Sequence, residues 1–188
     1  MTDRRAELLA GATVWVLDHG LAELSLRPLA RALGTSDRML LYYFDSKDIL
    51  VAEVSRSAAE MLVTAMPTVG GPDAPTSARR WLEGCWDLFT DPALRPAMAL
   101  LFELDAAGAR APGGTRDAAS AVARQWLGVV DSVLVSVRVK ATPKRRQSLA
   151  KVVAAAFIGL VLDALIADDP SRPTAELKLL ADLVDAAR

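Results

Sequence analysis

Residues 25–47 read SLRPLARALGTSDRMLLYYFDSK, and this stretch decides the fold. Ser25 can cap a helix, because its hydroxyl can accept from free N–H groups of the first turn, and Pro28 is tolerated so early in a helix. Apolar residues then recur at helical spacing until Gly34, which suits the left-handed backbone that follows a helix. Ser36 can cap the next helix at once. Two helices joined by so short a turn predict a helix-turn-helix, whose second helix lies in the major groove of DNA.

The sequence around this motif resembles the N-terminal domain of the TetR (tetracycline-repressor) family of bacterial transcriptional regulators. The resemblance rests on Gly20 at the end of a first helix, on Leu29-Ala30-Arg31-Ala32-Leu33-Gly34, and on Tyr42-Tyr43-Phe44-Asp45-Ser46-Lys47. It extends over residues 4–52, about a quarter of the chain. Two positions depart from the family pattern, since Leu41 stands where the family often has tyrosine and Arg38 where it often has a small residue.

The recognition helix and its surroundings supply the candidate DNA contacts. Arg38 lies at the start of that helix, where an arginine either reads guanine or only meets a phosphate, and both readings stay open. Tyr42 and Lys47 are the best phosphate candidates, whereas Asp37 is better suited to capping the helix. Phe44 is expected in the core. The predicted DNA-binding residues are Ser25, Arg27, Ser36, Asp37, Arg38, Met39, Tyr42 and Lys47.

The head, residues 1–47, carries no net charge. It has six basic and six acidic side chains. The basic ones are Arg4, Arg5, Arg27, Arg31, Arg38 and Lys47, and the acidic ones are Asp3, Glu7, Asp18, Glu23, Asp37 and Asp45. Because much of the affinity for DNA comes from counterion release, each head should bind only modestly, and useful binding should require two heads on one DNA. The charge count therefore predicts a homodimer.

The composition of the 188-residue chain predicts an all-α protein of the cytoplasm. Alanine and leucine dominate, β-branched runs are few, and no Asn-Gly hairpin turn occurs. The single cysteine, Cys85, has no partner for an internal disulfide, and no secretion signal is evident. The most apolar stretch, residues 152–162, is shorter than the ~18 apolar residues that a membrane span needs, so we expect a buried helix there.

About nine helices are expected, in a head of residues 1–47 and a ligand-binding and dimerisation body of residues 48–188. Three prolines and two glycines make residues 67–75 a loop. Pro96 should break or kink a helix that begins at Asp91. Outside the motif the expected helices span residues 4–19, 48–66 (a connector), 76–90, 97–109, 115–140, 142–167 and 174–187.

The last two helices are the candidate dimer interface. Residues 152–162 are apolar all round, so this segment should be covered on two sides, and Ala155 and Gly159 would permit close approach of a second copy. The resemblance implies the same assignment, because the last two long helices of TetR regulators form their dimer interface. The predicted interface residues are Val152, Ala155, Gly159, Leu177, Leu180 and Val184.

Aromatic and flexible apolar side chains concentrate in the body. They can form an ordinary core, or some of them can line a ligand cavity between helices, with Asp105 as a polar contact. The resemblance favours the cavity, since TetR bodies commonly bind small molecules, and it implies a small apolar or amphipathic effector. The predicted ligand-binding residues are Trp81, Cys85, Trp86, Phe89, Met98, Phe102, Asp105 and Trp126.

Motifs for catalysis or for a metal are missing from the sequence. With one histidine and one cysteine, a catalytic triad could use only His19, and zinc clusters of His and Cys are not available. We therefore expect no enzyme, no metal and no cofactor. The sequence predicts a ligand-released repressor that binds a palindromic operator in double-stranded DNA as a dimer. The alternative is a helical small-molecule-binding or interaction module with weak or lost DNA binding.

Overall fold

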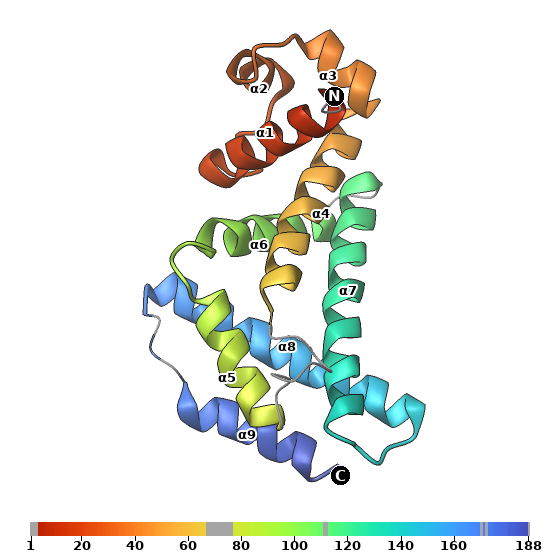
Figure 1. The fold of residues 1–188 in the computed structure, drawn as a ribbon, viewed down its shortest axis with the longest axis vertical. Helices are drawn as coiled ribbons and strands as arrows, with labels where there is room; N and C mark the ends of the chain where they lie inside the picture. The colour runs from red at the N-terminus through yellow and green to blue at the C-terminus, as the bar shows by residue number, and fades with distance from the viewer. Residues whose placement is uncertain (1–3, 67–76, 111–112, 170, 172, 188) are drawn as a thin grey trace. The chain divides into compact units, whose positions relative to one another are not determined.

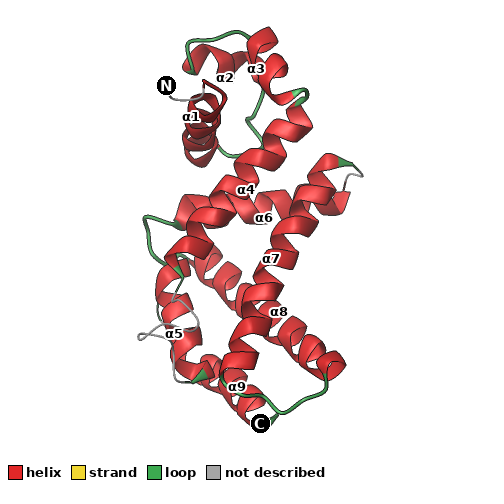
Figure 2. Cartoon of the chain, turned by 45° about the vertical axis from the view of Figure 1, so that its right-hand side comes forward, coloured by secondary structure: helices red, strands yellow, loops and turns green. Residues whose placement is uncertain are grey.

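The computed structural model describes residues 4–66, 77–110, 113–169, 171 and 173–187, and these contain nine α-helices and no strand (Figures 1 and 2). The expected all-α class is therefore confirmed. The loop expected at residues 67–75 lies outside the described residues. The helices are α1 (Arg4–His19), α2 (Leu26–Ala32), α3 (Asp37–Phe44), α4 (Lys47–Ala65), α5 (Ala78–Phe89), α6 (Arg95–Arg110), α7 (Gly114–Ser136), α8 (Pro143–Ala167) and α9 (Thr174–Asp185).

Local capping chemistry sets several of the helix starts. The hydroxyls of Ser36, Ser77 and Thr142 each accept from the backbone N–H three residues on, at 3.2, 3.3 and 3.3 Å. Gly34 has φ +62°, the left-handed backbone expected at the turn between α2 and α3. Ser25 occupies the N-cap position of α2 in extended backbone, but its hydroxyl makes no capping hydrogen bond, so that detail of the prediction is wrong.

Pro96 starts a helix and does not break one. The structure has turns after Asp91, and α6 begins at Arg95, with Pro96 as its second residue. Proline is accommodated there because the first N–H groups of a helix have no partner within it. The expected kink is therefore wrong, and it gives no support to a cavity at this point. α7 also ends earlier than expected, at Ser136, and Arg138 follows with φ +62°.

The chain packs as two units, and the first contains residues 1–62 and 96–123. Leu8, Leu29 and Phe44 of the three N-terminal helices share one buried core with Val54 of α4 and Leu104 of α6. This unit therefore extends beyond the expected head of residues 1–47, because α4, α6 and the start of α7 complete its core. We call it the head unit.

The second unit contains residues 63–95 and 124–188, and we call it the body unit. Its helix α5 contacts α9 and α8, and α8 contacts α9 (Figure 1). The core includes Trp81 and Phe89 of α5, Phe157 of α8 and Leu177 of α9, all at most 2% exposed.

Helix α8 is buried on one side only. Val153, Phe157 and Val161 lie in the core, whereas Val152 and Leu162 are exposed. Among the described residues, α8 is the one helix that is long and apolar enough to cross a membrane by length and composition. A single helix of this kind is weak evidence for a span, since core helices of soluble proteins pass the same test.

Candidate functional site

Helix α3 has one buried face and one exposed face. Leu40 and Phe44, four residues apart, are at most 1% exposed and lie in the core of the head unit. Arg38, Met39 and Tyr42 are exposed, and Tyr42 is the most exposed of the large apolar side chains on α3, at 74%. At 100° per residue these three lie on the side of the helix opposite the core. The expectation that Phe44 is a core residue is confirmed.

Arg5 of α1 contacts α3 at Tyr43 and at the buried Phe44. Its Nε donates to the backbone carbonyl of Tyr43 at 3.1 Å, and its guanidinium lies 5.0 Å from the centre of the Phe44 ring. A second guanidinium nitrogen forms an ion pair with Glu53 of α4. One side chain thus joins α1, α3 and α4. No local sequence pattern predicts this role, because the partners of Arg5 lie 38 and 48 residues away along the chain.

Glu103 of α6 holds the turn between α1 and α2. Its Oε2 accepts from the backbone N–H of Leu21 at 2.6 Å and from that of Ala22 at 3.3 Å. Gly20 precedes them with φ +82°, and a Cβ added there would lie 3.0 Å from Oε1 of Glu103. The positive φ favours glycine at residue 20, and a larger residue there would also press on the carboxylate of Glu103. This contact also went unpredicted, since no short-range pattern links α6 to that turn.

The six basic side chains of residues 1–47 differ in whether they form ion pairs. Arg4 pairs with Glu7, and Arg5 pairs with Glu53. Within the described part of the chain, the other four cations of residues 1–47 have no ion-pair partner and are exposed. These four are Arg27, Arg31, Arg38 and Lys47.

Lys47 is the first residue of α4, directly after Ser46, whose hydroxyl accepts from the Ile49 N–H at 3.2 Å. Asp37, in the first turn of α3, is half-buried, as suits a residue that interacts with the helix N-terminus. The other seven predicted DNA-binding residues are exposed, and all eight lie on α2, on α3, at the N-caps of these two helices, or at the first residue of α4. Their contacts with DNA stay predictions.

Five aromatic rings meet in the body unit, and we call them the ring cluster: Trp81, Trp86, Phe89, Trp126 and Phe157. Trp126 of α7 lies 5.7 Å from Trp81, 5.5 Å from Phe89 and 5.9 Å from Phe157, between ring centres. Phe157 was not among the predicted ligand-binding residues, because its position on an all-apolar helix carries no signal of its own.

The remaining predicted ligand-binding residues have different surroundings. Cys85 is fully buried on α5, and burial raises the pKa of its thiol far above the ordinary range. Met98, Phe102 and Asp105 lie on α6 and belong to the head unit. Asp105 is exposed, and partial desolvation raises the pKa of its carboxyl. That any of these residues touches a ligand stays a prediction.

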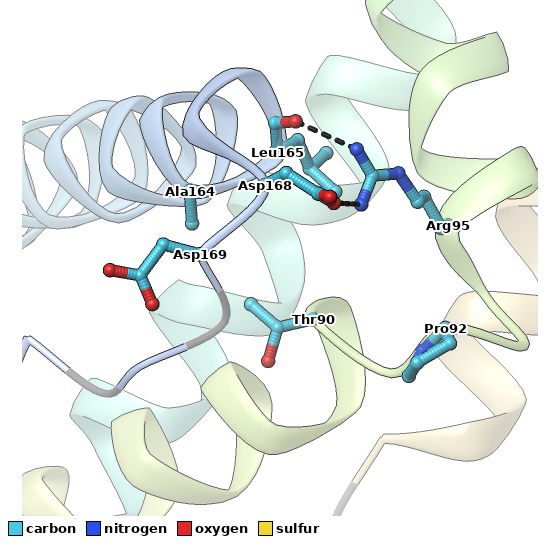
Figure 3. Close-up of a pocket in the computed structure, with 7 residues that line it drawn as sticks. All are labelled: Thr90, Pro92, Arg95, Ala164, Leu165, Asp168 and Asp169. Atoms are coloured by element: carbon cyan, nitrogen blue, oxygen red, sulfur yellow. Dashed lines mark hydrogen bonds and ion pairs between the residues drawn. The ribbon is translucent and has the colours of Figure 1, made fainter.

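A small surface pocket of the body unit lies where α8 ends (Figure 3). Arg95 donates to the Leu165 carbonyl at 2.9 Å and forms an ion pair with Asp168, which ends α8 with φ +53°. Asp169 accepts from the Ser171 N–H at 2.9 Å, and hydrogen bonds from Ser171 lower the pKa of this carboxyl. The charged groups that line the pocket are thus engaged with each other or with the local backbone.

The exposed faces of α8 and α9 differ in part from the predicted interface. On α8, Val152, Ala155 and Gly159 are exposed as expected, and Leu162 and Ile166 continue the same stripe. On α9, Leu177, Leu180 and Val184 are buried within the protomer, so they have no free side-chain surface for a second copy and this part of the prediction is wrong. The exposed apolar residues of α9 are Leu179 and Leu183.

A capped recognition helix with an exposed polar and aromatic face, set in a three-helix head, defines a helix-turn-helix DNA-binding transcriptional regulator. Residues 8–54 match the family described as bacterial regulatory proteins, tetR family. The expected resemblance to that family is confirmed by this match. No curated protein matches the sequence. Among the described residues, no group of three or more His, Cys, Asp or Glu is arranged to hold a metal ion.

Solved structures of regulators share the fold over nearly the whole chain. A TetR-family transcriptional regulator from a Rhodococcus species is 19% identical, with a TM-score of 0.73 over 100% of this chain and 99% of that one. A TetR regulator from Haloarcula marismortui is 18% identical, with a TM-score of 0.72 over 100% and 99%. The multidrug binding protein EbrR, complexed with proflavin, is 23% identical, with a TM-score of 0.71 over 96% and 99%. The chain therefore shares the fold of these transcriptional regulators.

Proposed function

We propose that this regulator is a repressor of the cytoplasm that binds a palindromic operator as a homodimer and leaves it when a small molecule binds the body unit. The observation that carries the DNA part is the exposed face of α3, where Arg38, Met39 and Tyr42 lie opposite the core. Arg5 contacts the backbone of this helix at Tyr43, and the exposed face would enter a major groove. The protein needs no metal or organic cofactor for this task.

The proposed dimer uses the exposed stripe of α8, Val152, Ala155, Gly159, Leu162 and Ile166, together with Leu179 and Leu183 of α9. Contiguous apolar surface of this kind is typical of protein–protein contacts. Small residues in its middle would let two copies of α8 approach closely. Two heads held by one dimer would supply the affinity that a single neutral head lacks.

The proposed effector site is the ring cluster of the body unit. Aromatic side chains from three helices meet there, and pockets between helices commonly bind apolar ligands. EbrR, which shares the fold, is described as a multidrug binding protein and was solved with proflavin and with imidazole. Release would be a population shift, and reversing operator occupancy from 99:1 to 1:99 would require about a 10⁴-fold preference of the effector for the non-binding state.

The DNA-binding assignment can be tested with variants of exposed cations. Sequences bound by the wild type are first selected from a random duplex library, and binding is then titrated at several salt concentrations. Arg38→Ala should abolish or relax the sequence preference, because Arg38 is the candidate base reader. Lys47→Ala should weaken binding to all sequences alike and lower the slope of log K against log salt by about two for a dimer.

Arg31→Ala is the matched control, since Arg31 is an exposed cation of α2 a full turn beyond Arg27. It should leave both affinity and sequence preference nearly unchanged. If Arg38→Ala and Lys47→Ala behave like this control, the reading face is not on α3. If the wild type selects no sequence at all, the chain is instead a helical small-molecule-binding or interaction module.

A further inference from the structure

The ring cluster contains two hydrogen-bond donors that have no acceptor. The indole Nε1 atoms of Trp81 and Trp126 are both inaccessible to water and have no hydrogen-bond partner among the described residues. Trp81 as a whole is only 1% exposed. The other two buried side-chain atoms in this condition, in Glu53 and Ser55, belong to the head unit. In the described part of the body unit, the unmet polar groups are therefore concentrated at one stacked pair of rings.

The two donors cannot satisfy each other. The Trp81 and Trp126 rings lie 5.7 Å apart with only 20° between their planes, so each in-plane N–H runs roughly parallel to the face of the other ring. A buried N–H without a partner costs about 1–3 kcal/mol, and native proteins rarely leave one unexplained. Two at the same place mark a site where an acceptor from outside the chain would be stabilised.

The charges around the cluster argue against a cationic occupant. The carboxylate of Glu83 on α5 forms an ion pair with Arg79, and that of Asp131 on α7 forms one with Arg146. Asp87 of α5 also has an interaction of its own. Among the described residues of α5 and of the body-unit part of α7, a cation would thus find donors and rings but no carboxylate without a partner, and Asp163 of α8 is exposed. A buried anion would need a counter-charge that the cluster does not contain.

We propose that the ring cluster binds a neutral, planar aromatic compound whose ring nitrogen, carbonyl or ether oxygen accepts hydrogen bonds from the indole N–H groups of Trp81 and Trp126. Phe89 and Phe157, at 5.5 and 5.9 Å from Trp126, supply the aromatic surface, and the two indoles supply the selection for an acceptor. The proposal rests on the effector site proposed above and names the chemistry of its ligand.

Naphthalene and quinoline form a matched pair of probes, since they have the same shape and quinoline replaces one C–H by an acceptor nitrogen. In two-dimensional ¹H–¹⁵N spectra, quinoline should move the indole N–H protons of Trp81 and Trp126 downfield, as hydrogen bonding does. Naphthalene should lack that downfield shift. The indole signal of Trp15, which stacks on His19 in the head unit, should not move with either probe.

Affinity provides a second measurement. The ratio of quinoline to naphthalene affinity should fall about fivefold to tenfold in Trp81→Phe and in Trp126→Phe, because these variants keep a ring and lose the donor. Trp15→Phe is the control and should leave the ratio unchanged. Comparing ratios cancels the loss of packing that the smaller ring causes for both probes, and the spectra of the wild type do not depend on the variants folding.

Three results would overturn the proposal: no binding of either probe, an affinity ratio that the variants do not change, or indole protons that do not move with quinoline. The second and third would mean that bound water satisfies the two donors. None of these results bears on DNA binding by the head. Conversely, if quinoline binds as expected but does not weaken operator binding, the ligand chemistry stands and the proposed release mechanism fails.

Discussion

Arg5 of α1 links the recognition helix α3 to α4. It donates to the Tyr43 carbonyl, lies against the Phe44 ring and pairs with Glu53, whose side chain is only 16% exposed. One carboxylate oxygen of Glu53 is buried without a partner of its own. The ion pair therefore offsets the cost of placing Glu53 there, and its loss would leave a poorly solvated charge.

Arg5→Ala should lower the free energy of unfolding by about 1–3 kcal/mol, because the carboxylate of Glu53 loses its partner. Urea unfolding of wild type and variant measures this difference. Arg4→Ala is the control, since its ion pair with Glu7 is half-exposed and should contribute no more than about 1 kcal/mol. Adding Glu53→Gln to Arg5→Ala should restore part of the loss. Equal effects of Arg4→Ala and Arg5→Ala would contradict the anchoring role.

Cys85 should make stability depend on alkaline pH. Its thiol is buried and its pKa in the folded chain is raised by desolvation, whereas an unfolded cysteine has a pKa of about 8.5. Above that pH only the unfolded chain releases the proton, so the contribution of the thiol is complete below about pH 8.5 and falls as pH rises.

Comparison of the wild type with Cys85→Ala isolates this contribution from other groups that titrate at high pH. The free energy of unfolding of the wild type minus that of Cys85→Ala should fall by about 1.4 kcal/mol from pH 7.5 to pH 9.5, because only the wild type has the thiol. Urea unfolding at each pH provides the values. A difference that stays constant over this range would mean that the thiol is not buried in solution.

At the scale of elements, α6 is tied to the DNA-reading helices by Glu103. Its carboxylate accepts from two backbone N–H groups of the turn between α1 and α2, and hydrogen bonds to a charged acceptor are stronger than neutral ones. Because α6 also places Leu100 and Leu104 in the core of the head unit, its position and that of the turn are coupled.

Glu103→Ala should speed amide hydrogen exchange at Leu21 and Ala22, since both N–H groups lose their acceptor. Glu103→Gln keeps one acceptor oxygen and should have a smaller effect. Asp105→Ala changes an exposed carboxylate of the same helix and should leave exchange at the turn unaffected. If exchange at the two amides is the same in all three variants, the turn does not depend on α6.

Helix limits were predictable where local chemistry sets them. α1 runs from Arg4 to His19 as expected, and Thr142 and Pro143 start α8 because capping and proline geometry act within one turn. Pro96 was misplaced because the same residue suits a helix start and a helix break. An apolar stripe such as Leu177 to Val184 shows which face is buried, but not whether it is buried by its own chain or by another. The contacts of Arg5 and Glu103 were not predictable, because their partners lie far away along the chain and produce no short-range sequence pattern.

At the scale of the whole molecule, the proposed DNA-reading site and the proposed effector site fall in different units of the chain. The predicted DNA contacts lie in the head unit and the ring cluster lies in the body unit. Helices α4 and α7 run from one unit into the other, because residues 62 and 63 lie within α4 and residues 123 and 124 within α7. The proposed release mechanism therefore predicts that effector binding in the body unit changes DNA binding by the head unit.

The proposed dimer can be tested at two glycines. A Cβ added at Gly159 of α8 or at Gly128 of α7 would meet no atom within 4 Å, and both residues are exposed, so the protomer should tolerate either substitution. Gly159 lies in the proposed interface stripe, where a glutamate would place a charge between two closely packed helices. Gly128 lies outside that stripe.

Gly159→Glu should therefore be monomeric at concentrations where the wild type and Gly128→Glu are dimers, as sedimentation equilibrium would measure. Its affinity for the operator should fall at least about 100-fold, because two linked heads gain roughly 10² to 10⁴ over one. Gly128→Glu should retain wild-type affinity. A dimeric Gly159→Glu variant would place the interface elsewhere on the body unit, and a monomeric wild type that still binds tightly would mean that one neutral head suffices.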